Sequence, residues 1–416
     1  MADTPAPDYS VRNLAKGSIP ALLIGVISAL ILFSVEWVAG QLQHLVWDVV
    51  PGAVGVAPDN GWWIIGTLGC TGLAVGLVVR LAPGHGGNDS AATELEAPVL
   101  KLSALPSLIA VTILALAGGV SLGPENPIIA INTAVLTAVA AKLFTRMPAR
   151  LIEALTLAGT ISALFGTPVA AALLFTGMAG LQSGGALFDR LFLPLAAAGA
   201  GALTAAAVGG VHLGVPVPPM PAPDVQDLVA AAVVASAAAA FGLIGAVLLP
   251  PVHRFFHGMK NPILFTTLGG LVLGCLGVIG GPVTLFKGAT ESAELVADRS
   301  ADTPGMLFLT AVIKILAVVV AAAAGFRGGR IFPAVFIGVS LGLSAAGLVP
   351  GLPVSLAVAA GVLGVVLAIA RDGWLALFVA VAVTGDVGVL PLLVIAILPA
   401  WLVVTNAPEM LAKPAK

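Results

Sequence analysis

Gly123-Pro124-Glu125-Asn126-Pro127 and Gly329-Arg330-Ile331-Phe332-Pro333 are two Gly- and Pro-containing stretches that each interrupt a long apolar region. They begin 206 residues apart, and the triplet Leu-Gly-Cys recurs at nearly the same offset, at Leu68 and at Leu273. A constant offset between several features indicates an internal duplication. The sequence therefore predicts two related halves, each containing an interrupted apolar segment.

The composition indicates that the solvent of this chain is a lipid bilayer. Of its 416 residues, 59% are hydrophobic and only 9% are charged, against roughly 25% charged in soluble domains. The 50 Gly and 30 Pro lie among apolar residues, which excludes a disordered or collagen-like chain. A net charge of -2 without a dense Lys/Arg cluster excludes nucleic-acid binding. Cys70 and Cys275 lie in apolar runs, so we expect buried thiols rather than a disulfide.

The apolar runs predict a polytopic membrane protein with broken helices. The first run, about 19–38, is too long for the core of a signal peptide and predicts the first membrane helix. Later runs are either too short to cross roughly 30 Å as one helix or long enough for two. Non-helical backbone at membrane depth persists only where it is buried in protein or lines a cavity, so these breaks indicate a polar site.

A Pro-rich linker divides the chain near its middle, because five prolines at 216, 218, 219, 221 and 223 rule out a continuous helix. No appended regulatory domain is expected. The predicted parts are an N-terminal cytoplasmic tail (1–18), a first membrane repeat (19–211), the linker (212–225), a second membrane repeat (226–404) and a C-terminal tail (405–416).

Charge predicts that the two repeats are inverted. The loop Lys142 to Arg150 is basic, whereas its counterpart near 344–356 contains neither Lys nor Arg. The loop His253 to Lys260 is also basic, and its counterpart near 45–57 contains neither residue. Basic residues gather in cytoplasmic loops, so corresponding loops should face opposite sides of the membrane. Inverted repeats with broken helices place a substrate site between the halves, which favours transport over a receptor or structural role.

Three Gly-rich turns lead into predicted helices, at 84–89 (GHGGND), 123–127 (GPENP) and 328–333 (GGRIFP). Gly allows the backbone to approach a ligand, Pro suits the first helical turn, and free N–H groups at a helix N-terminus bind anions. Each single turn could instead serve only to kink or pack helices. Because two of the three turns are matched between the repeats, we favour a site for a small anion such as a halide.

An inverted repeat with GPENP in one half and GGRIFP in the other resembles the CLC family of chloride channels and transporters. The resemblance covers about 19–404 and is closest to short bacterial members associated with ion transport. The family's anion-binding turns read roughly GSGIP, GREGP and GxFxP, and the second matches best here. The resemblance implies an all-α inverted-repeat bundle of tilted and broken helices, located in the bacterial inner membrane. It also implies a homodimer with one pore per subunit.

Glu125 is the first candidate functional residue, because a carboxylate in an apolar run is costly. In the family the equivalent Glu is a gate that occupies an anion position until it is protonated. A carboxylate mimics an anion at a helix N-terminus, while burial opposes its charge. The expected anion-binding residues are Gly84, His85, Gly86, Gly123, Asn126, Pro127, Gly329, Arg330, Ile331 and Phe332.

Two of these positions differ from the family pattern. His85 falls where the family has a Ser that coordinates the central anion. An imidazole N–H can donate to an anion, but a packed or backbone-facing His is an equally good interpretation. Ile331 replaces the family's Phe, and Phe332 follows one position later. The aromatic lining is therefore expected to be shifted.

The cations near the third turn have two interpretations. Arg327, Arg330 and Lys314 lie in or beside apolar sequence and could attract anions toward a pore. For Lys314 and Arg327, a charge pair with a carboxylate such as Asp372, or an extended side chain that reaches the interface, is an alternative.

Further departures concern proton coupling. The family's exchangers carry an inward-facing Glu, and the matching positions here are Gly177 and Met178. The family's inner Tyr is also absent, since the only Tyr is Tyr9. Asp386 and Val387 stand near that point as a candidate inner gate, although Asp386 could simply cap the following helix. We therefore expect passive, channel-like conduction of a small anion, and the alternative is a proton-coupled antiporter.

Other function classes find little support. There is no HExxH or GxSxG motif, which disfavours a membrane enzyme. His253 and His257 have metal-like i, i+4 spacing, but no carboxylate lies beside them in sequence and their neighbours are basic. A carrier of cations or organic solutes would need more acids at the midplane. The sequence thus predicts no enzyme, cofactor or metal site, and partners limited to a small anion such as chloride, protons, lipid and a second copy.

Overall fold

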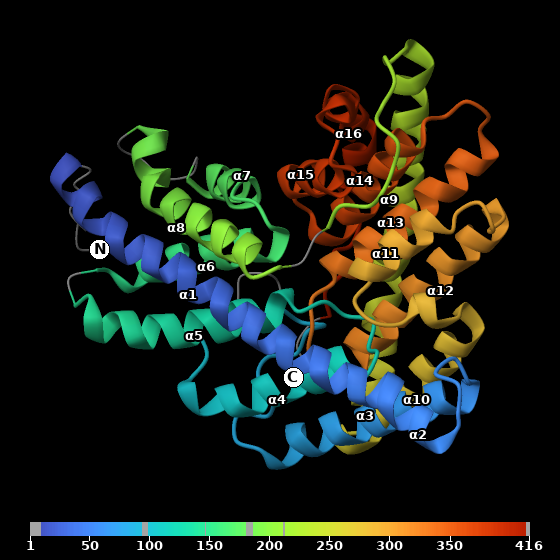
Figure 1. The fold of residues 1–416 in the computed structure, drawn as a ribbon, viewed down its shortest axis with the longest axis horizontal. Helices are drawn as coiled ribbons and strands as arrows, with labels where there is room; N and C mark the ends of the chain where they lie inside the picture. The colour runs from blue at the N-terminus through green and yellow to red at the C-terminus, as the bar shows by residue number, and fades with distance from the viewer. Residues whose placement is uncertain (1–9, 94–98, 146, 180–185, 211–212, 413–416) are drawn as a thin grey trace. The chain divides into compact units, whose positions relative to one another are not determined.

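The structure is a computed structural model, and it describes residues 10–93, 99–145, 147–179, 186–210 and 213–412 (Figure 1). These residues form helices and connecting turns, and the described part contains no strand beyond one isolated two-residue bridge. Eight described helical segments are long and apolar enough to span a membrane. The prediction of an all-α, multi-pass membrane protein is confirmed.

The α-helices range from short turns to segments longer than a bilayer is thick. They are α1 (Val11–His44), α2 (Val50–Val54), α3 (Gly61–Leu81), α4 (Leu105–Ala117), α5 (Glu125–Leu143), α6 (Ala149–Phe165), α7 (Val169–Ala179), α8 (Leu187–Ala207), α9 (Val225–His257), α10 (Pro262–Gly280), α11 (Ala289–Ala297), α12 (Pro304–Ala323), α13 (Ile331–Leu348), α14 (Val354–Ala370), α15 (Gly373–Thr384) and α16 (Leu390–Val404).

The first helix is longer than its apolar run. It begins at Val11 and continues past Pro20 to His44, so residues 11–18 are helical. Residues 11–18 contain no Pro, so the helical hydrogen bonds of the backbone continue through this polar segment. At the linker, Asp224 accepts a hydrogen bond from the N–H of Asp227 and forms a capping box that starts α9.

The chain forms two compact units. Unit 1 comprises 1–34 and 128–212, and unit 2 comprises 35–127 and 213–416. In unit 1, α6 packs against α7 and α8 around apolar side chains that include Ile24, Leu136 and Ile152. A Cβ on Gly201 would collide with the carbonyl oxygen of Gly159, so α6 and α8 approach closely through small residues.

In unit 2, the two helices that carry the repeated Leu-Gly-Cys triplets lie side by side. A Cβ on Gly270 of α10 would collide with the carbonyl oxygen of Leu68 in α3, so this contact requires Gly. Arg80 Nη1 donates to Asn261 Oδ1 at 3.2 Å, which joins the end of α3 to the start of α10. The triplets that revealed the duplication therefore mark a packing surface.

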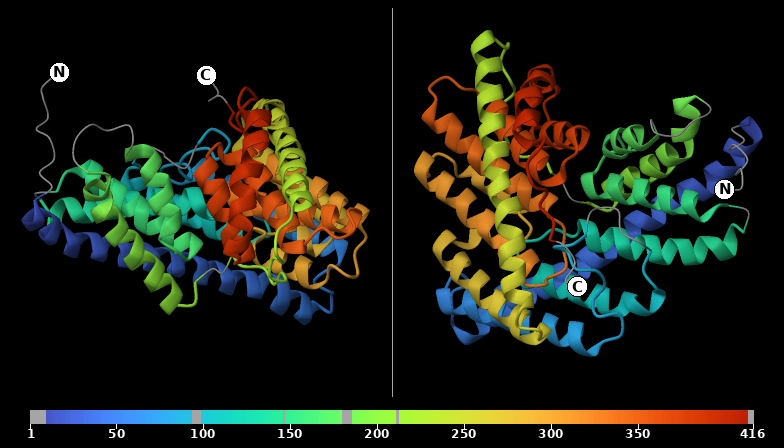
Figure 2. Two further views of the ribbon diagram at one scale, coloured as in Figure 1. Left: turned by 90° about the horizontal axis from the view of Figure 1, so that it is seen from above. Right: turned by 180° about the vertical axis from the view of Figure 1, so that it is seen from behind.

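The core of unit 2 is built around α14, which packs against α9, α13, α15 and α16 (Figure 2). Nearly all of its residues are buried. A Cβ on Gly361 would collide with the carbonyl oxygen of Gly338 in α13, so small residues again set the helix separation.

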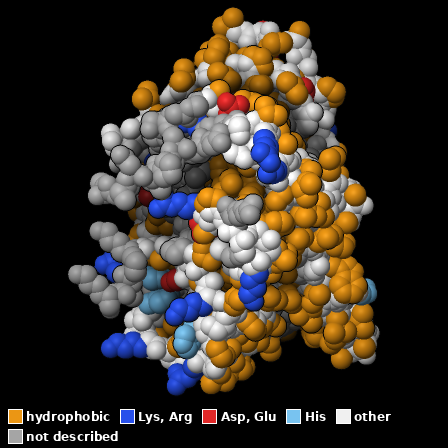
Figure 3. Space-filling view, turned by 90° about the vertical axis from the view of Figure 1, so that its left-hand side faces the viewer, with side chains coloured by type: hydrophobic (Ala, Val, Ile, Leu, Met, Phe, Trp, Pro, Cys, Tyr) orange, Lys and Arg blue, Asp and Glu red, His pale blue; other side chains and the backbone are white. Residues whose placement is uncertain are grey.

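The surface is apolar over large areas, as expected of a protein in lipid. Hydrophobic side chains cover much of the face shown in Figure 3. Cys70 and Cys275 are free, as predicted, but both are exposed, so the expectation of burial is wrong. Their helices expose apolar faces as well, and an apolar thiol suits such a face as well as a core.

Candidate functional site

The second and third Gly-rich turns meet in unit 2. The N–H of Gly123 donates to the carbonyl oxygen of Gly329 at 2.8 Å, and the N–H of Gly329 donates back to that of Gly123 at 2.6 Å. These two hydrogen bonds form the isolated antiparallel bridge. The bridge joins the two glycines that the 206-residue offset matched.

Glu125 lies directly over this bridge. Its side chain is completely buried, and Oε1 accepts a hydrogen bond from the N–H of Phe332 at 2.7 Å, in the first turn of α13. A Cβ on either Gly123 or Gly329 would collide with Oε2. The two glycines therefore make room for the carboxyl group at a helix N-terminus, where the helix dipole favours an anion.

The second oxygen of this carboxyl group is unsatisfied. Glu125 Oε2 has no hydrogen-bond partner within the described residues, although it is buried. A buried charged oxygen without a donor is costly, whereas a protonated carboxyl group or a mobile anion would relieve that cost. The geometry fits a carboxylate that holds an anion position and can leave it.

The first Gly-rich turn follows a left-handed backbone path. Gly84, Gly86 and Gly87 have φ of 80°, 70° and 74°, and His85 between them has φ of 52°. The exposed His85 places Nδ1 2.9 Å from the carbonyl oxygen of Val79. Because a carbonyl oxygen only accepts, Nδ1 must carry the proton, and a neutral ring then offers Nε2 only as an acceptor.

Arg327 connects this first turn to the third. Its Nε donates to the carbonyl oxygen of Gly86 at 3.1 Å, and Nη2 donates to that of His85 at 3.4 Å. In addition, the N–H of Gly328 donates to Ser90 Oγ at 2.8 Å. All three predicted anion-binding turns are thus brought together in unit 2.

The predicted carboxylate partner of Arg327 was the wrong one. Arg327 Nη1 lies 3.7 Å from Asp89 Oδ1, in the first turn. Asp372 instead caps the N-terminus of α15, where Oδ1 accepts from the N–H of Leu375 at 2.9 Å. The charge pair itself was a correct expectation, but residues so distant in sequence could not be matched from the sequence alone.

Lys314 does not pair with Asp372, and the carboxylate that acts on its charge is Glu291. It is fully buried, and its Nζ donates to the carbonyl oxygens of Thr284, Leu285 and Phe286 at 2.9, 2.8 and 2.8 Å. Its charge is therefore satisfied by the peptide backbone, and the side chain does not extend to an interface. Lys314 fixes the shape of the 284–286 segment.

Arg330 holds the C-terminal segment. Its side chain is 8% exposed, and the guanidinium group donates to the carbonyl oxygens of Met410 and of Thr93, the latter at 3.1 Å. The N–H of Ala412 also donates a hydrogen bond to the carbonyl oxygen of Ala91 at 2.7 Å. Met410 and Ala412, in the segment that the sequence suggested as a tail, are therefore bonded to the rest of unit 2 near the first turn.

The remaining predicted anion-binding residues lie in the first turns of two helices. Asn126 is half-buried and Pro127 is buried in α5, directly after Glu125. Ile331 and Phe332 begin α13 and are 4% and 0% exposed. Phe332 contacts Glu125 through its backbone N–H, which donates to the carboxyl group, and not through its aromatic ring.

One charged residue near this site was missed by sequence reasoning. Lys287 Nζ lies 2.5 Å from Glu36 Oε1 and 5.8 Å from the centroid of the Phe332 ring. It lies in a short polar stretch, so its sequence gives no sign of an intramembrane charge. The apolar surroundings of Glu36 in α1 were the available signal, since such a carboxylate requires a partner.

Asp386 and Val387, the candidate inner gate, lie before α16. Asp386 Oδ1 accepts from the N–H of Gly388 at 2.7 Å, and Oδ2 accepts from that of Met220 in the linker at 2.5 Å. Val387 is 70% exposed. These bonds favour the capping interpretation of Asp386. The side chains of Gly177 and Met178 lie outside the described residues.

Comparisons with known proteins show the family of this chain. The family described as Voltage gated chloride channel matches residues 70–405. The protein YfeO of Escherichia coli O9:H4 (strain HS), whose name proposes an ion-transport role, is 49% identical over 405 residues, which cover 97% of both chains. YfeO of Escherichia coli (strain K12 / DH10B) gives the same identity and coverage.

Solved structures share the fold. A slow cyanobacterial chloride/proton antiporter superposes with a TM-score of 0.77 at 16% identity, covering 95% of this chain and 96% of its own. A CLC-type fluoride/proton antiporter gives a TM-score of 0.70 at 19% identity, covering 96% and 98%. At these identities the likeness concerns the fold, and it confirms the inverted-repeat bundle predicted from the sequence.

Proposed function

The chain belongs to the voltage gated chloride channel family, a family of anion transporters and channels, and on this premise we propose that it conducts a small inorganic anion, chloride first, past a gate formed by Glu125. The observation that carries the proposal is the position of the Glu125 carboxyl group. It is buried at the N-terminus of α13 with one oxygen hydrogen-bonded to Phe332 and the other unsatisfied.

The gating step follows from competition for one position. While Glu125 is ionised, its carboxylate takes the N–H of Phe332 and excludes an anion of the same charge. Protonation removes the charge and weakens that hydrogen bond, because bonds to ionised acceptors are roughly twice as strong as neutral ones. The side chain can then leave, and an anion can accept from the freed N–H.

We propose passive conduction rather than obligatory proton exchange. Exchange needs an internal route for protons to Glu125, and Gly177 and Met178 cannot bind a proton at the positions where exchangers carry an acid. Both carboxylate oxygens of Asp386 already accept backbone hydrogen bonds. The alternative, a proton-coupled antiporter, is favoured by the two solved antiporters that share this fold.

A gradient experiment separates these two mechanisms. In liposomes containing the purified protein, an imposed chloride gradient should drive anion flux without uphill movement of protons. Proton pumping would establish the antiporter alternative. If pumping occurs and disappears in Asp386→Asn, Asp386 is the proton relay rather than a cap, whereas persistent pumping in that variant would place the relay elsewhere.

Substitution of His85 should alter anion preference. The ring is exposed at the first Gly-rich turn, where Nδ1 donates to the carbonyl oxygen of Val79 and Nε2 remains available to a polar ligand. We expect His85→Ala to change the chloride-to-nitrate permeability ratio by about tenfold. Anion efflux from liposomes measures the ratio. His44→Ala, at an exposed His, is the control, and an unchanged ratio in His85→Ala would assign His85 to packing.

We further propose that the protein lies in a bacterial inner membrane and forms a homodimer. The helical membrane spans and the Escherichia coli relatives support this location. The small-residue surface of α8 around 196–208 would permit close association. Crosslinking in native membranes, followed by mass determination in detergent, should give a dimer, and a monomer under both conditions would contradict this proposal.

A further inference from the structure

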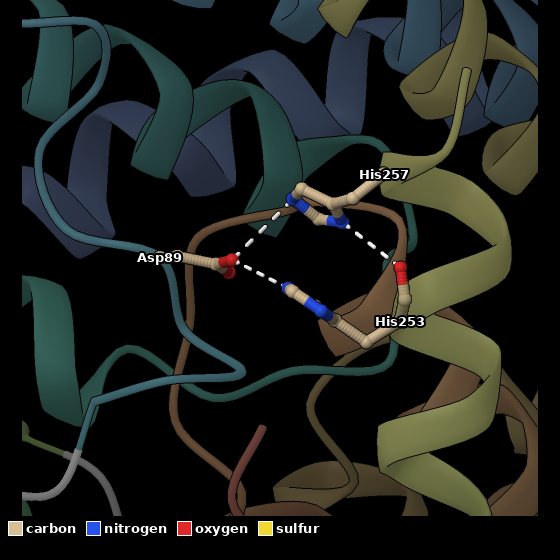
Figure 4. A group of neighbouring side chains, drawn as sticks. All are labelled: Asp89, His253 and His257. Atoms are coloured by element: carbon tan, nitrogen blue, oxygen red, sulfur yellow. Dashed lines mark hydrogen bonds and ion pairs between the residues drawn. The ribbon is translucent and has the colours of Figure 1, made fainter. Parts of the chain in front are cut away.

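Three potential metal ligands, Asp89, His253 and His257, lie close together at the end of the first Gly-rich turn (Figure 4). Asp89 comes from that turn, and His253 and His257 come from the last turns of α9. Asp89 Oδ2 lies 2.8 Å from Nε2 of His253 and 3.4 Å from Nε2 of His257. The three ligand atoms all lie within 4.8 Å of one another.

The hydrogen bonds of His257 leave an electrostatic mismatch. Its Nδ1 lies 3.2 Å from the carbonyl oxygen of His253, which can only accept, so Nδ1 carries a proton. The Nε2 of the neutral ring is then a bare acceptor that faces the carboxylate oxygen of Asp89 at 3.4 Å. This nitrogen and the carboxylate oxygen face each other favourably when a cation lies between them, either a second proton on His257 or a metal ion.

The surroundings keep Asp89 in its anionic form. Burial raises the pKa of Asp89, but the hydrogen bond from His253 and the charge of Arg327 outweigh it and hold this pKa below its ordinary value. Oδ1 also accepts from the N–H of Ala91 at 3.1 Å. Oδ1 is thus held by Arg327 and the backbone, and Oδ2 alone is presented to the two imidazoles.

The imidazoles are also held in place. His253 is 3% exposed, its ring stacks on that of His257 at a centroid distance of 3.8 Å, and His257 stacks in turn on Phe265 at 4.7 Å. The carbonyl oxygen that fixes Nδ1 of His257 is the kind of outer partner that orients metal-binding imidazoles. The stacking orders both rings, and each must turn so that the two Nε2 lone pairs converge on one ion.

We propose that Asp89, His253 and His257 bind a divalent transition-metal ion, with Zn²⁺ as the best fit. Two imidazole nitrogens and one carboxylate oxygen form a donor set typical of Zn²⁺. Ligand atoms in a tetrahedral zinc site lie roughly 3.3 Å apart, close to the Asp89–His257 separation of 3.4 Å. A water molecule completes the fourth position.

Binding requires one proton shift within His253. The ion takes the place of the proton that Nε2 donates to Asp89, and Nδ1 carries the proton instead, so the imidazole stays neutral and no net proton is released. The metal then links α9 to the turn that Arg327 joins to the third turn. The site is independent of the gate proposed for Glu125, and its occupancy can be measured without any transport assay.

The test uses the full chain, purified in detergent and depleted of metal with a chelator. Zinc titration by calorimetry should give one ion per chain, and X-ray absorption should show nitrogen and oxygen ligands with imidazole scattering and no sulfur. His257→Gln and Asp89→Asn should each weaken binding by more than the roughly 10–100-fold that loss of an outer partner costs.

The matched control is His44→Gln. His44 and Asp48 form an exposed His–carboxylate pair at 2.8 Å that has no third ligand among the residues the structure describes, so this variant should bind zinc like the wild type. Equal loss in the control, sulfur ligation, or no saturable binding by the wild type would overturn the proposal. If both cluster variants fail to fold, the wild-type stoichiometry and absorption spectrum still decide it.

Discussion

Glu125→Gln should raise anion flux at neutral pH and remove most of its dependence on external pH. Gln preserves the shape of the side chain, and its carbonyl oxygen can still accept from the N–H of Phe332, but it carries no charge to compete with the anion. In the wild type, an anion flux that requires protonation of Glu125 should rise by up to about tenfold for each unit fall in pH. The variant should show a nearly flat profile.

The measurement is chloride efflux from liposomes over a range of external pH. Glu294→Gln, at an exposed residue of α11, is the control for loss of a carboxylate in general. Wild-type rates and an unaltered pH profile in Glu125→Gln would contradict the gate. So would an equal change in the Glu294 variant, because that would indicate a general effect of surface charge.

The sequence predicted the duplication because matching residues recur at a constant spacing along the chain, and the structure shows that two of these matched pairs lie close together. The offset matched Gly123 with Gly329, and these residues pair through their backbones. It also matched Leu68 with Leu273, on helices that pack together. Such contacts follow from the symmetry of the duplication and need no knowledge of side-chain partners.

Partner choice between charged residues could not be predicted in the same way. Apolar surroundings indicated that Arg327 needed a partner, but several carboxylates could supply it. The interaction of His253 with Asp89 spans 164 positions in the sequence. Sequence spacing gave the His pair on one helix face, and only the fold showed the third ligand that makes a metal site conceivable.

The burial of side chains was hardest to predict in apolar helices, because such helices can face either the protein interior or the lipid. Apolar neighbours around Cys70 and Cys275 are equally consistent with a protein interior and with a lipid-facing surface. In the same way, the apolar sequence around Lys314 suggested either a long side chain reaching the interface or an acid partner. The observed solution, an ammonium group bound by three carbonyl oxygens, leaves no pattern in the sequence.

Lys314→Met should destabilise the protein strongly, by about 3 to 5 kcal/mol. Met fills a similar volume but removes all three donated hydrogen bonds, and the carbonyl oxygens of Leu285 and Phe286 lose this charged donor inside the protein. Thermal unfolding in detergent, followed by Trp fluorescence, measures the loss. Lys142→Met, at the exposed end of α5, should change stability by no more than about 0.5 kcal/mol.

The same variant distinguishes a structural Lys314 from one that attracts anions. The segment it fixes leads into Lys287, whose Nζ lies 5.8 Å from the ring centroid of Phe332 beside the gate. A structural Lys314 therefore predicts that lost flux accompanies lost stability and that the remaining folded protein keeps its anion affinity. Weakened anion affinity at unchanged stability would instead assign the Lys314 charge to the permeation pathway, because the field of a buried charge is only weakly screened and can act on an anion directly.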